Sequence, residues 1–452
     1  MTVSQIRPTS SNPVRRAAQS RSFRVLMLLL LHIPLAIVMH SSPLAARLHA
    51  VVTLAVGAFW LLTKRDATYW VYWASYVTGA EVLWRMTGGA VSHESAKYAV
   101  AIVFILGTLK QRSLPRADKW PLVYFALLLP SCLLMPQFDR ELIAFNLAGP
   151  FSLAAASLYL STVHLSTEQL GLVCIAALGP IMSTAYLATH SMLTAESLVF
   201  GGGSNRIAAG DSGPNQVSAI LGLGALLAFL FVVIERGHRR LRIIVAGILL
   251  WMIAQAMLTF SRGGVWTALG AVLVAGFYLV RERRLRRLTL VDGIVAGLLV
   301  WYLLLPALDA FTGEMLSARF GSADPTGRDL IVEADLIAFR ENPLFGVGPG
   351  QSRAYHALLY MPSLPHTEFS RLLAEHGSLG LLSLLILLGV TLRRASARVA
   401  PLSKAYSVSL TAWALLDMTH VAMRLVAAPF AFGLASAISP QLSPAHGAMR
   451  ED

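Results

Sequence analysis

Apolar stretches recur along nearly the whole chain, and short polar segments separate them. Many are about 16 to 20 residues long, enough for an α-helix to cross a hydrocarbon core roughly 30 Å thick, and some are shorter. Backbone polar groups in lipid must bond internally, so these stretches are predicted to be helices. The predicted spans are 25–39, 48–63, 67–84, 97–109, 120–135, 142–163, 169–189, 216–234, 243–259, 263–280, 289–305, 377–392, 405–420 and 425–438. Because the last two could form one re-entrant hairpin, the pattern predicts an all-α, polytopic integral membrane protein with about 12 to 14 transmembrane helices.

The first span follows a basic segment, residues 1–24, and precedes the sequence SSPLAA. This combination also resembles a signal peptide with a small-residue cleavage site. We favour an uncleaved anchor, because the basic segment is long and more spans follow. Residues 1–24 are then a cytoplasmic segment, and residues 25–305 carry the first block of transmembrane helices.

Composition and charge agree with a membrane protein. Hydrophobic residues make up 56% of the chain and charged residues 13%, and the mean hydropathy of +0.62 excludes an ordinary soluble protein. The net charge of +13 could indicate binding of nucleic acid, but the distribution of the charges along the chain favours another interpretation. With a cytoplasmic N-terminus, 25 of the 37 Lys and Arg residues fall in inner segments. This is the positive-inside pattern, so the basic runs are interpreted as topology signals and no nucleic-acid partner is predicted.

The two cysteines, Cys132 and Cys174, lie inside apolar spans and lack the spacing of metal ligands. They are interpreted as small core residues, and neither a disulfide framework nor a zinc site is expected.

Two predicted outer segments are longer than a turn: residues 190–215 and residues 306–376. The second is long enough to form a large periplasmic helical subdomain, which the C-terminal helices of 377–438 and a cytoplasmic tail, 439–452, follow. Its sequence DLIVEADLIAFREN predicts a helix with one apolar stripe. That stripe comprises Leu330, Ala334, Ile337 and Ala338.

The same outer segment continues with NPLFGVGPGQS, in which Pro343 is expected to end the helix. Gly346, Gly348 and Gly350 then form a turn whose backbone can approach a neighbour closely. Without a preceding strand this is not a dinucleotide fingerprint. A tight turn returning to the membrane and a loop in which Gly348 contacts substrate are equally compatible with the pattern.

The stretch SLPHTEFSRLLAEHGSLGLL, residues 363–382, joins a polar half to an apolar run. Pro365 suits the first turn of a helix. At 100° per residue, Glu368, Arg371 and Glu375 share one stripe, which is interpreted as a self-paired, solvated face. The opposite side, expected to point towards the protein interior or the membrane boundary, holds His366, Phe369, Leu373 and His376. A histidine on an apolar face is most often structural, so the pattern alone does not make His366 catalytic.

Two arginines fall at the predicted outer face, Arg206 in GGGSNRIAAGDSGPNQ and Arg262 in LTFSRGGVW. A charge between apolar helices is energetically unfavourable unless it has a partner or reaches water. Arg262 is therefore a candidate functional residue. Snorkelling, or pairing with an acid such as Asp211, is the structural alternative for either residue. Glu81 and Arg85 are four residues apart near the outer end of one span and are interpreted first as a structural ion pair and second as part of a donor site. The same weighting applies to Asp417, His420 and Arg424.

Four of these motifs together, NRIAAGDSGPNQ, SRGG, NPLFGVGPGQ and PHTEFSRLLAEHGSLGL, resemble the bacterial O-antigen ligase and polymerase family. These are membrane glycosyltransferases that use glycans linked to a polyprenyl diphosphate. The resemblance covers residues 200–390 by motif and the whole chain by topology. Its motif residues match Arg206, Arg262 and His366. One departure is Thr367, where the family often has asparagine, and this leaves exopolysaccharide relatives as compatible as the lipopolysaccharide ligases.

The resemblance implies a reaction at the periplasmic face of the bacterial inner membrane. Arg206 and Arg262 would stabilise the leaving diphosphate without a metal or other cofactor, and His366 would take the proton of an acceptor hydroxyl, with inversion at the anomeric carbon. Glu368 is an alternative base, although it lies about 160° from His366 on the helical wheel. Among the loop arginines, Arg328 in TGRDL is the best further candidate for substrate contact. The others left open are Arg319, Arg340, Arg353 and Arg371.

The expected partners are a polyprenyl-diphosphate-linked glycan donor, a glycan or lipid-core acceptor, and the lipid bilayer. Ligation to a lipid core and polymerisation of repeat units share donor chemistry, and the sequence does not separate them. A transporter or flippase of lipid-linked oligosaccharides is the alternative from another class. Transporters tend to place polar sites near the membrane midplane within internal repeats. In this sequence, the candidate charged residues instead gather at the predicted outer face of the membrane.

Overall fold

The computed structural model describes residues 13–133, 135, 138–324, 327–359, 367–421 and 423–442. Within these ranges the regular elements are helices, and one isolated bridge joins Leu165 to Ile438. The helices are α1 (Pro13–Ser41), α2 (Pro43–Thr63), α3 (Ala67–Met86), α4 (Ser95–Lys110), η1 (Leu114–Arg116), α5 (Trp120–Ala126), α6 (Pro130–Leu133), α7 (Arg140–Leu160), α8 (Thr167–Thr194), η2 (Ile207–Ala209), α9 (Pro214–Ile234), α10 (Arg239–Leu258), α11 (Arg262–Leu279), α12 (Arg283–Leu299), η3 (Val300–Leu304), α13 (Leu305–Phe311), α14 (Met315–Gly321), α15 (Arg328–Glu341), α16 (Arg353–Leu358), α17 (Glu368–Ser396), α18 (Pro401–Asp417) and α19 (Ala427–Leu434). The all-α prediction is confirmed for the described part of the chain.

Nine helical segments in the described ranges are long and apolar enough to cross a membrane. Each of the other predicted spans also coincides with helix, but these helices are shorter or more polar. For example, α4 has 16 residues, α18 has 17 and α19 has 8. The multi-pass architecture is therefore supported, while the count of 12 to 14 spans stays a prediction.

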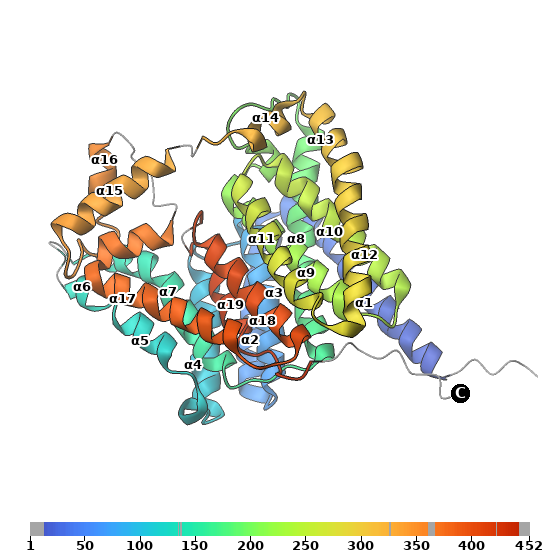
Figure 1. Cartoon of the computed structure of the whole chain (residues 1–452), viewed down its shortest axis with the longest axis horizontal. Helices are drawn as coiled ribbons and strands as arrows, with labels where there is room; N and C mark the ends of the chain where they lie inside the picture. The colour runs from blue at the N-terminus through green and yellow to red at the C-terminus, as the bar shows by residue number, and fades with distance from the viewer. Residues whose placement is uncertain are drawn as a thin grey trace, which may run out of the picture.

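The polar character of α3 follows from its place inside the bundle. It packs against α8, α2, α4, α9 and α19, and Figure 1 shows it surrounded by other helices. Its buried residues include Ser75, Thr78 and Glu81. By contrast, none of the most apolar window of 285–311 is buried, so that segment presents its side chains outward, as a lipid-facing helix does. A helix that other helices shield from lipid can carry more polar side chains than a helix that faces lipid.

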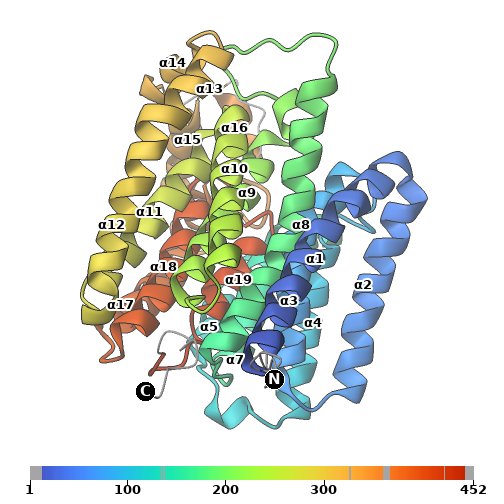
Figure 2. The ribbon, with the colours of Figure 1, turned by 90° about the vertical axis from the view of Figure 1, so that its right-hand side faces the viewer.

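The connections between helices gather at two opposite ends of the bundle (Figure 2). At one end lie α14 and the α8–α9 connection, and the α10–α11 turn joins them through hydrogen bonds from Asn205 and Arg262. We call it the Arg262 end. At the other end lie the α2–α3 and α4–α5 connections, with Lys110 between them, and we call it the Lys110 end. These ends correspond to the predicted outer and inner faces.

Small residues bring the helices that carry the Arg262 turn very close together. A Cβ added to Gly264 of α11 would lie 2.0 Å from the carbonyl oxygen of Ser218 on α9. Likewise, a Cβ added to Gly222 would lie 2.4 Å from the carbonyl oxygen of Gly264. Backbones approach this closely only where side chains are absent, as is common between membrane helices. The start of α11, and hence Arg262, is therefore fixed firmly against α9.

The helices α14, α15 and α16, in the described residues of 306–376, divide between two sides of the bundle. Figure 1 shows α14 beside α13, and on the other side α15 between α16 and α17. The predicted stripe of the middle helix is partly wrong: Ala334 and Ala338 are buried in α15, but Leu330 is exposed and Ile331 is buried in its place. The buried face also includes the charged residue Asp335, which shifts the stripe by about one position.

Candidate functional site

The turn between α10 and α11 positions Arg262 as the first residue of α11. Phe260 in this turn has a left-handed backbone, with φ of +56°, and Ser261 precedes the helix. The Arg262 guanidinium donates to the carbonyl oxygen of Arg319 in α14 and to those of Ser322 and Asp324 just after α14. Its role in the described structure is therefore to hold this loop segment, rather than to snorkel or to pair with Asp211.

Two further arginines gather around Arg262. Arg319 is buried and donates from Nε to the carbonyl oxygen of Phe260 at 3.2 Å. Burial lowers the pKa of Arg319, and the charge of Arg262 lowers it further, while Asp324 offsets part of this effect. Burial also lowers the pKa of Arg328, as do the charges of Arg262 and Arg319. These three residues form a cationic cluster, which we call the arginine cluster.

Arg328 differs from its two neighbours in the use of its donors. It is half-buried at the start of α15, and within the described part of the chain its guanidinium makes no hydrogen bond. The donors of Arg262 and Arg319, by contrast, are directed to backbone oxygens. Contact between Arg328 and substrate stays a prediction.

The loop that carries Arg206 docks on the same turn. The Asn205 N–H donates to the Thr259 carbonyl oxygen at 2.8 Å, and the Gln255 side chain donates to the Ala208 carbonyl oxygen at 2.8 Å. Arg206 itself is exposed and donates to the carbonyl oxygen of Asp211 at 3.1 Å. The structure thus brings the Arg206 and Arg262 segments together, whereas the sequence predicted only that both lie at the same face.

Glu81 and Arg85 form the predicted ion pair, at 2.5 Å, and both are buried or nearly so. Arg85 also donates to the Gln216 side chain at 2.9 Å and to the Arg424 carbonyl oxygen at 3.0 Å. Glu81 accepts from the Val426 N–H at 2.7 Å. The pair therefore joins α3 to α9 and to the segment before α19. It supports the neighbouring backbone, and a direct role in donor binding stays a prediction.

The stripe of Glu368, Arg371 and Glu375 pairs as predicted, but its predicted exposure is wrong. Arg371 donates to Glu368 at 3.0 Å, to Glu375 at 2.6 Å and to the Asn146 carbonyl oxygen at 3.3 Å. The residues are 0%, 3% and 0% exposed. Since α17 packs against α5, α15 and α18, this face is covered by protein. Mutual pairing makes burial tolerable, because each charge keeps a partner.

The opposite side of α17 agrees with a face directed to the protein interior or the membrane boundary. His376 is fully buried, and Phe369 and Leu373 are half-buried. His366 lies outside the described residues, so its predicted orientation stays untested. The helix begins at Glu368, three residues after Pro365, with Thr367 as its N-cap.

The start of α17 nevertheless has a defined neighbour. The Glu368 N–H donates to the carbonyl oxygen of Met418 at 2.8 Å, in the turn that follows α18. In the same turn, His420 lies with Nε2 3.8 Å from Asp417 Oδ1, and both side chains are buried. A Cβ on Gly263 would lie 2.0 Å from His420 Cδ2, so the imidazole lies against the residue next to Arg262. The turn after α18 therefore connects the start of α17 with the arginine cluster.

The glycine turn of 346–350 is confirmed, and its close backbone contacts are with helices. Gly346, Gly348 and Gly350 have φ of 68°, 93° and 75°. The Gly348 N–H donates to the Glu375 carbonyl oxygen at 3.0 Å, and a Cβ there would lie 2.6 Å from Met135 Cγ. These contacts account for the glycine as a docking residue, and contact between Gly348 and substrate stays a prediction.

A buried cluster that the sequence reasoning missed connects α15, α16 and α17. Asp335 accepts from Ser370 at 2.6 Å and lies 2.8 Å from His356 Nε2, and all three residues are buried. The carboxylate bridges the serine and the histidine, so the histidine does not activate the serine as in a hydrolase triad. Asp335 lies outside the apolar stripe predicted for this helix, so that pattern carried no signal of the cluster.

No group of three or more His, Cys, Asp or Glu side chains that could hold a metal ion occurs among the described residues. Both cysteines are free and buried, as expected for core residues. Metal independence of the reaction stays a prediction.

Residues 247–385 match the model of a family described as O-antigen ligase. The match confirms the resemblance found in the motifs, and it extends from within α10 to within α17. It includes Arg262, Arg328, Gly348 and Glu368, whereas Glu81, Arg85 and Arg206 lie before it. No curated protein matches the chain.

Proposed function

We propose that the protein is a membrane glycosyltransferase that moves a glycan from a polyprenyl diphosphate carrier to an acceptor hydroxyl at the Arg262 end of the bundle, facing the periplasm. One observation carries the proposal: the arginine cluster forms within the segment that matches the O-antigen ligase family, and the Arg206 loop docks beside it. Guanidinium groups suit phosphate oxygens because their donors can bind two oxygens at once. The family match supports glycan transfer as the class of reaction.

In the proposed step, an acceptor hydroxyl oxygen forms a bond to the anomeric carbon as the bond from that carbon to the diphosphate oxygen breaks. The bonding electron pair leaves with the diphosphate, and the hydroxyl proton passes to a base. Cations already in place stabilise the negative charge that grows on the leaving group, because they need no reorganisation during the reaction. In-line displacement inverts the configuration at the anomeric carbon.

The arginines divide this work according to their contacts. Arg206 is exposed and Arg328 has unused donors within the described structure, so these two are proposed to bind the diphosphate directly. Arg262 contributes positive charge and holds the segment after α14 in place. Glu81 and Arg85 are proposed to position the surrounding backbone through their contacts with α9 and with Val426.

His366 is proposed as the base. Glu368, the alternative, is fully buried and accepts from Arg371 at 3.0 Å, which leaves it poorly placed to receive a substrate proton. Imidazole ordinarily titrates near pH 6.5, which suits proton transfer at neutral pH. The hydrogen bond from Glu368 to Met418 holds the start of α17, two residues after His366, at the turn that contacts Gly263.

The decisive experiment is transfer in vitro from a purified lipid-linked donor to candidate acceptors by the full chain in detergent. We expect Arg262→Ala and His366→Ala each to lower the rate by about 100-fold or more. Arg340→Ala is the matched control, because Arg340 is exposed on α15 and outside the arginine cluster, and it should keep the wild-type rate. Wild-type transfer by both site variants, with normal amounts in the membrane, would contradict the proposal.

The identity of the acceptor distinguishes ligation from polymerisation. In a deletion strain, loss of all repeats from lipopolysaccharide together with accumulation of lipid-linked polymer indicates a ligase. Single-repeat products or missing secreted polymer indicate a polymerase. In vitro, the same distinction appears as transfer to a lipid core or to a second lipid-linked repeat.

A further inference from the structure

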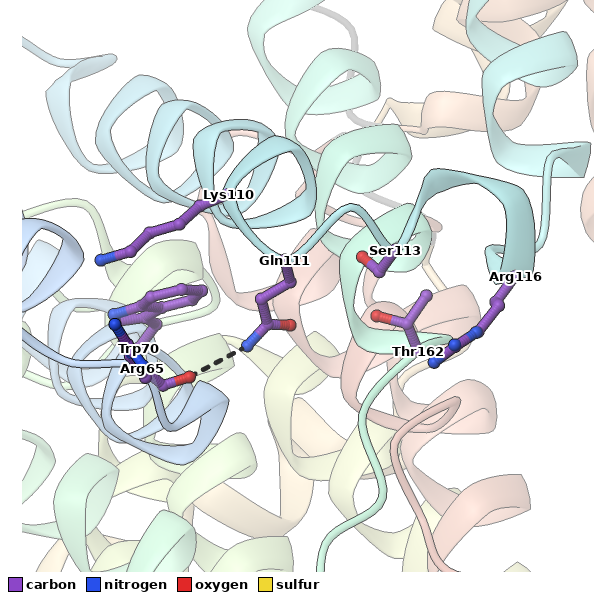
Figure 3. A pocket seen from close by; sticks show the side chains of 7 residues that line it. All are labelled: Arg65, Trp70, Lys110, Gln111, Ser113, Arg116 and Thr162. Carbon is purple, nitrogen blue, oxygen red and sulfur yellow. Dashed lines mark hydrogen bonds between the residues drawn. The ribbon is translucent and has the colours of Figure 1, made fainter.

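The Lys110 end of the bundle contains a pocket far from the arginine cluster, with a volume of about 460 Å³. It is lined by Arg65, Trp70, Lys110, Gln111, Ser113, Arg116 and Thr162. Figure 3 shows Lys110, Trp70 and Arg65 on one side, Ser113, Thr162 and Arg116 on the other, and Gln111 between them. The pocket forms where α2 meets α3, where α4 ends, and where α7 leads into α8.

The lining residues favour an anion as the ligand. Three of the seven carry a positive charge, and none of the seven is acidic. Lys110 donates to the carbonyl oxygens of Leu61, Leu62 and Lys64, which uses its three N–H groups and leaves its charge at the pocket wall. Its Nζ also lies 5.7 Å from the centre of the Trp70 ring. Lys110 therefore shapes the pocket and contributes electrostatic attraction.

Arg65 and Arg116 provide the available donors. Both are exposed, and in the part of the chain that the structure describes neither guanidinium has a hydrogen-bond or ion-pair partner. The Gln111 side chain donates to the Arg65 carbonyl oxygen at 3.4 Å, which connects the α4 end to the α2–α3 connection (Figure 3). Two guanidiniums facing one cavity can bind phosphate oxygens from different directions.

The surface beside the pocket distinguishes a lipid from a soluble anion. Exposed Ile102, Leu106 and Leu109 follow one another at helical spacing along α4 up to Lys110. Leu62, at the end of α2, is 80% exposed, and α2 packs against α4. Such side chains are stable in contact with hydrocarbon, so this stripe marks where acyl chains lie. A soluble anion would gain nothing from this apolar border.

We infer that this pocket binds the phosphate headgroup of an anionic phospholipid, with Arg65 and Arg116 on the phosphate and the acyl chains along the exposed stripe of α4. Basic pockets between membrane helices at the cytoplasmic side are suited to such headgroups. Trp70 and Lys110 agree with a pocket at the depth of the lipid headgroups, because tryptophan and lysine favour the interface between hydrocarbon and water. The inference does not depend on the reaction proposed for the Arg262 end.

The test measures lipid retained by the full chain after purification and incubation with phosphatidylglycerol or phosphatidylcholine, read by native mass spectrometry. The variant is Arg65→Gln with Arg116→Gln. The matched control is Arg286→Gln with Arg287→Gln, because these arginines are exposed on α12 in another inner basic run. Near an anionic surface each basic residue strengthens binding several-fold, so we expect retention of phosphatidylglycerol to fall on the order of tenfold in the pocket variant alone.

Three outcomes would overturn the inference. Equal retention of phosphatidylglycerol by the pocket variant and the wild type would show that the pocket does not bind the lipid. Equal retention of phosphatidylcholine and phosphatidylglycerol by the wild type would exclude selection for an anionic headgroup. Displacement of the lipid by inorganic phosphate, at matched ionic strength, would identify a soluble anion as the ligand.

Discussion

The imidazole of His420 lies directly against Gly263, so that a Cβ at residue 263 would come within 2.0 Å of His420 Cδ2. Gly263 follows Arg262 in the first turn of α11, and His420 belongs to the turn that receives the Glu368 N–H. The contact joins two regions that are more than 150 residues apart in the sequence, one in the matched family segment and one beyond it.

We expect Gly263→Ala to destabilise the protein by about 1 to 3 kcal/mol and to lower glycan transfer. The added methyl group must displace a buried ring and with it the turn after α18. Gly276→Ala on the same helix is the control, because nothing lies within 4 Å of a Cβ at that position. Alanine is the better helix former, so the control should be neutral or slightly stabilising. Measurement of the unfolding midpoint and the transfer rate for both variants checks this, and equal behaviour would refute the packing argument.

Arg328→Ala is expected to lower transfer by about 100-fold, with the main loss in binding and departure of the diphosphate. Arg340→Ala, on the exposed side of the same helix, should leave the rate unchanged. Initial rates at several donor concentrations separate the effect on donor binding from that on turnover. If the two variants behave alike, Arg328 only solvates the loop.

The triplet of Glu368, Arg371 and Glu375 allows a test of buried against exposed charge. Arg371→Met leaves two buried carboxylates without their common partner, and we expect a loss of about 3 to 5 kcal/mol in the free energy of unfolding. Arg393→Met removes the partner of Asp118 in an exposed pair, and its effect should stay below about 1 kcal/mol. Unfolding in a sodium dodecyl sulfate titration compares them. Similar losses in both variants would show that the triplet is solvated after all.

Treatment with EDTA is expected to leave the transfer rate unchanged. The proposal assigns stabilisation of the leaving diphosphate to Arg206 and the arginine cluster, so a divalent cation has no necessary part in it. The measurement is the initial rate of purified protein before and after chelation, with Mg²⁺ added back to exclude an indirect effect of the chelator. Loss of activity that Mg²⁺ restores would argue against the arginine-based mechanism.

The helices were predictable because their signal is local. Length and hydropathy place α8, α9 and α10 within a few residues of their predicted bounds, since each apolar stretch must bond its own backbone in lipid. Pairing between Glu81 and Arg85 was predictable for the same reason, because residues four apart meet on one helix face. The motifs likewise identified the family over the segment that its model matches.

Burial was not predictable in the same way, because it depends on what covers a face. The stripe of Glu368, Arg371 and Glu375 has the pattern of a solvated surface, and only the packing of α5, α15 and α18 around α17 encloses it. Asp335 is similar: its neighbours in sequence do not disclose that His356 and Ser370 reach its carboxylate.

The sequence by itself determined the helices, the distribution of charge between two ends and the arginines to consider, since these follow from residue type and spacing along one chain. Only the tertiary structure decided how those arginines are used. Arg262 holds the carbonyl oxygens that follow α14, whereas Arg328 keeps its donors unused by the described residues. The physical reason is that hydrogen-bond partners and desolvation come from segments distant in sequence, and their positions are set by the packing of the whole bundle.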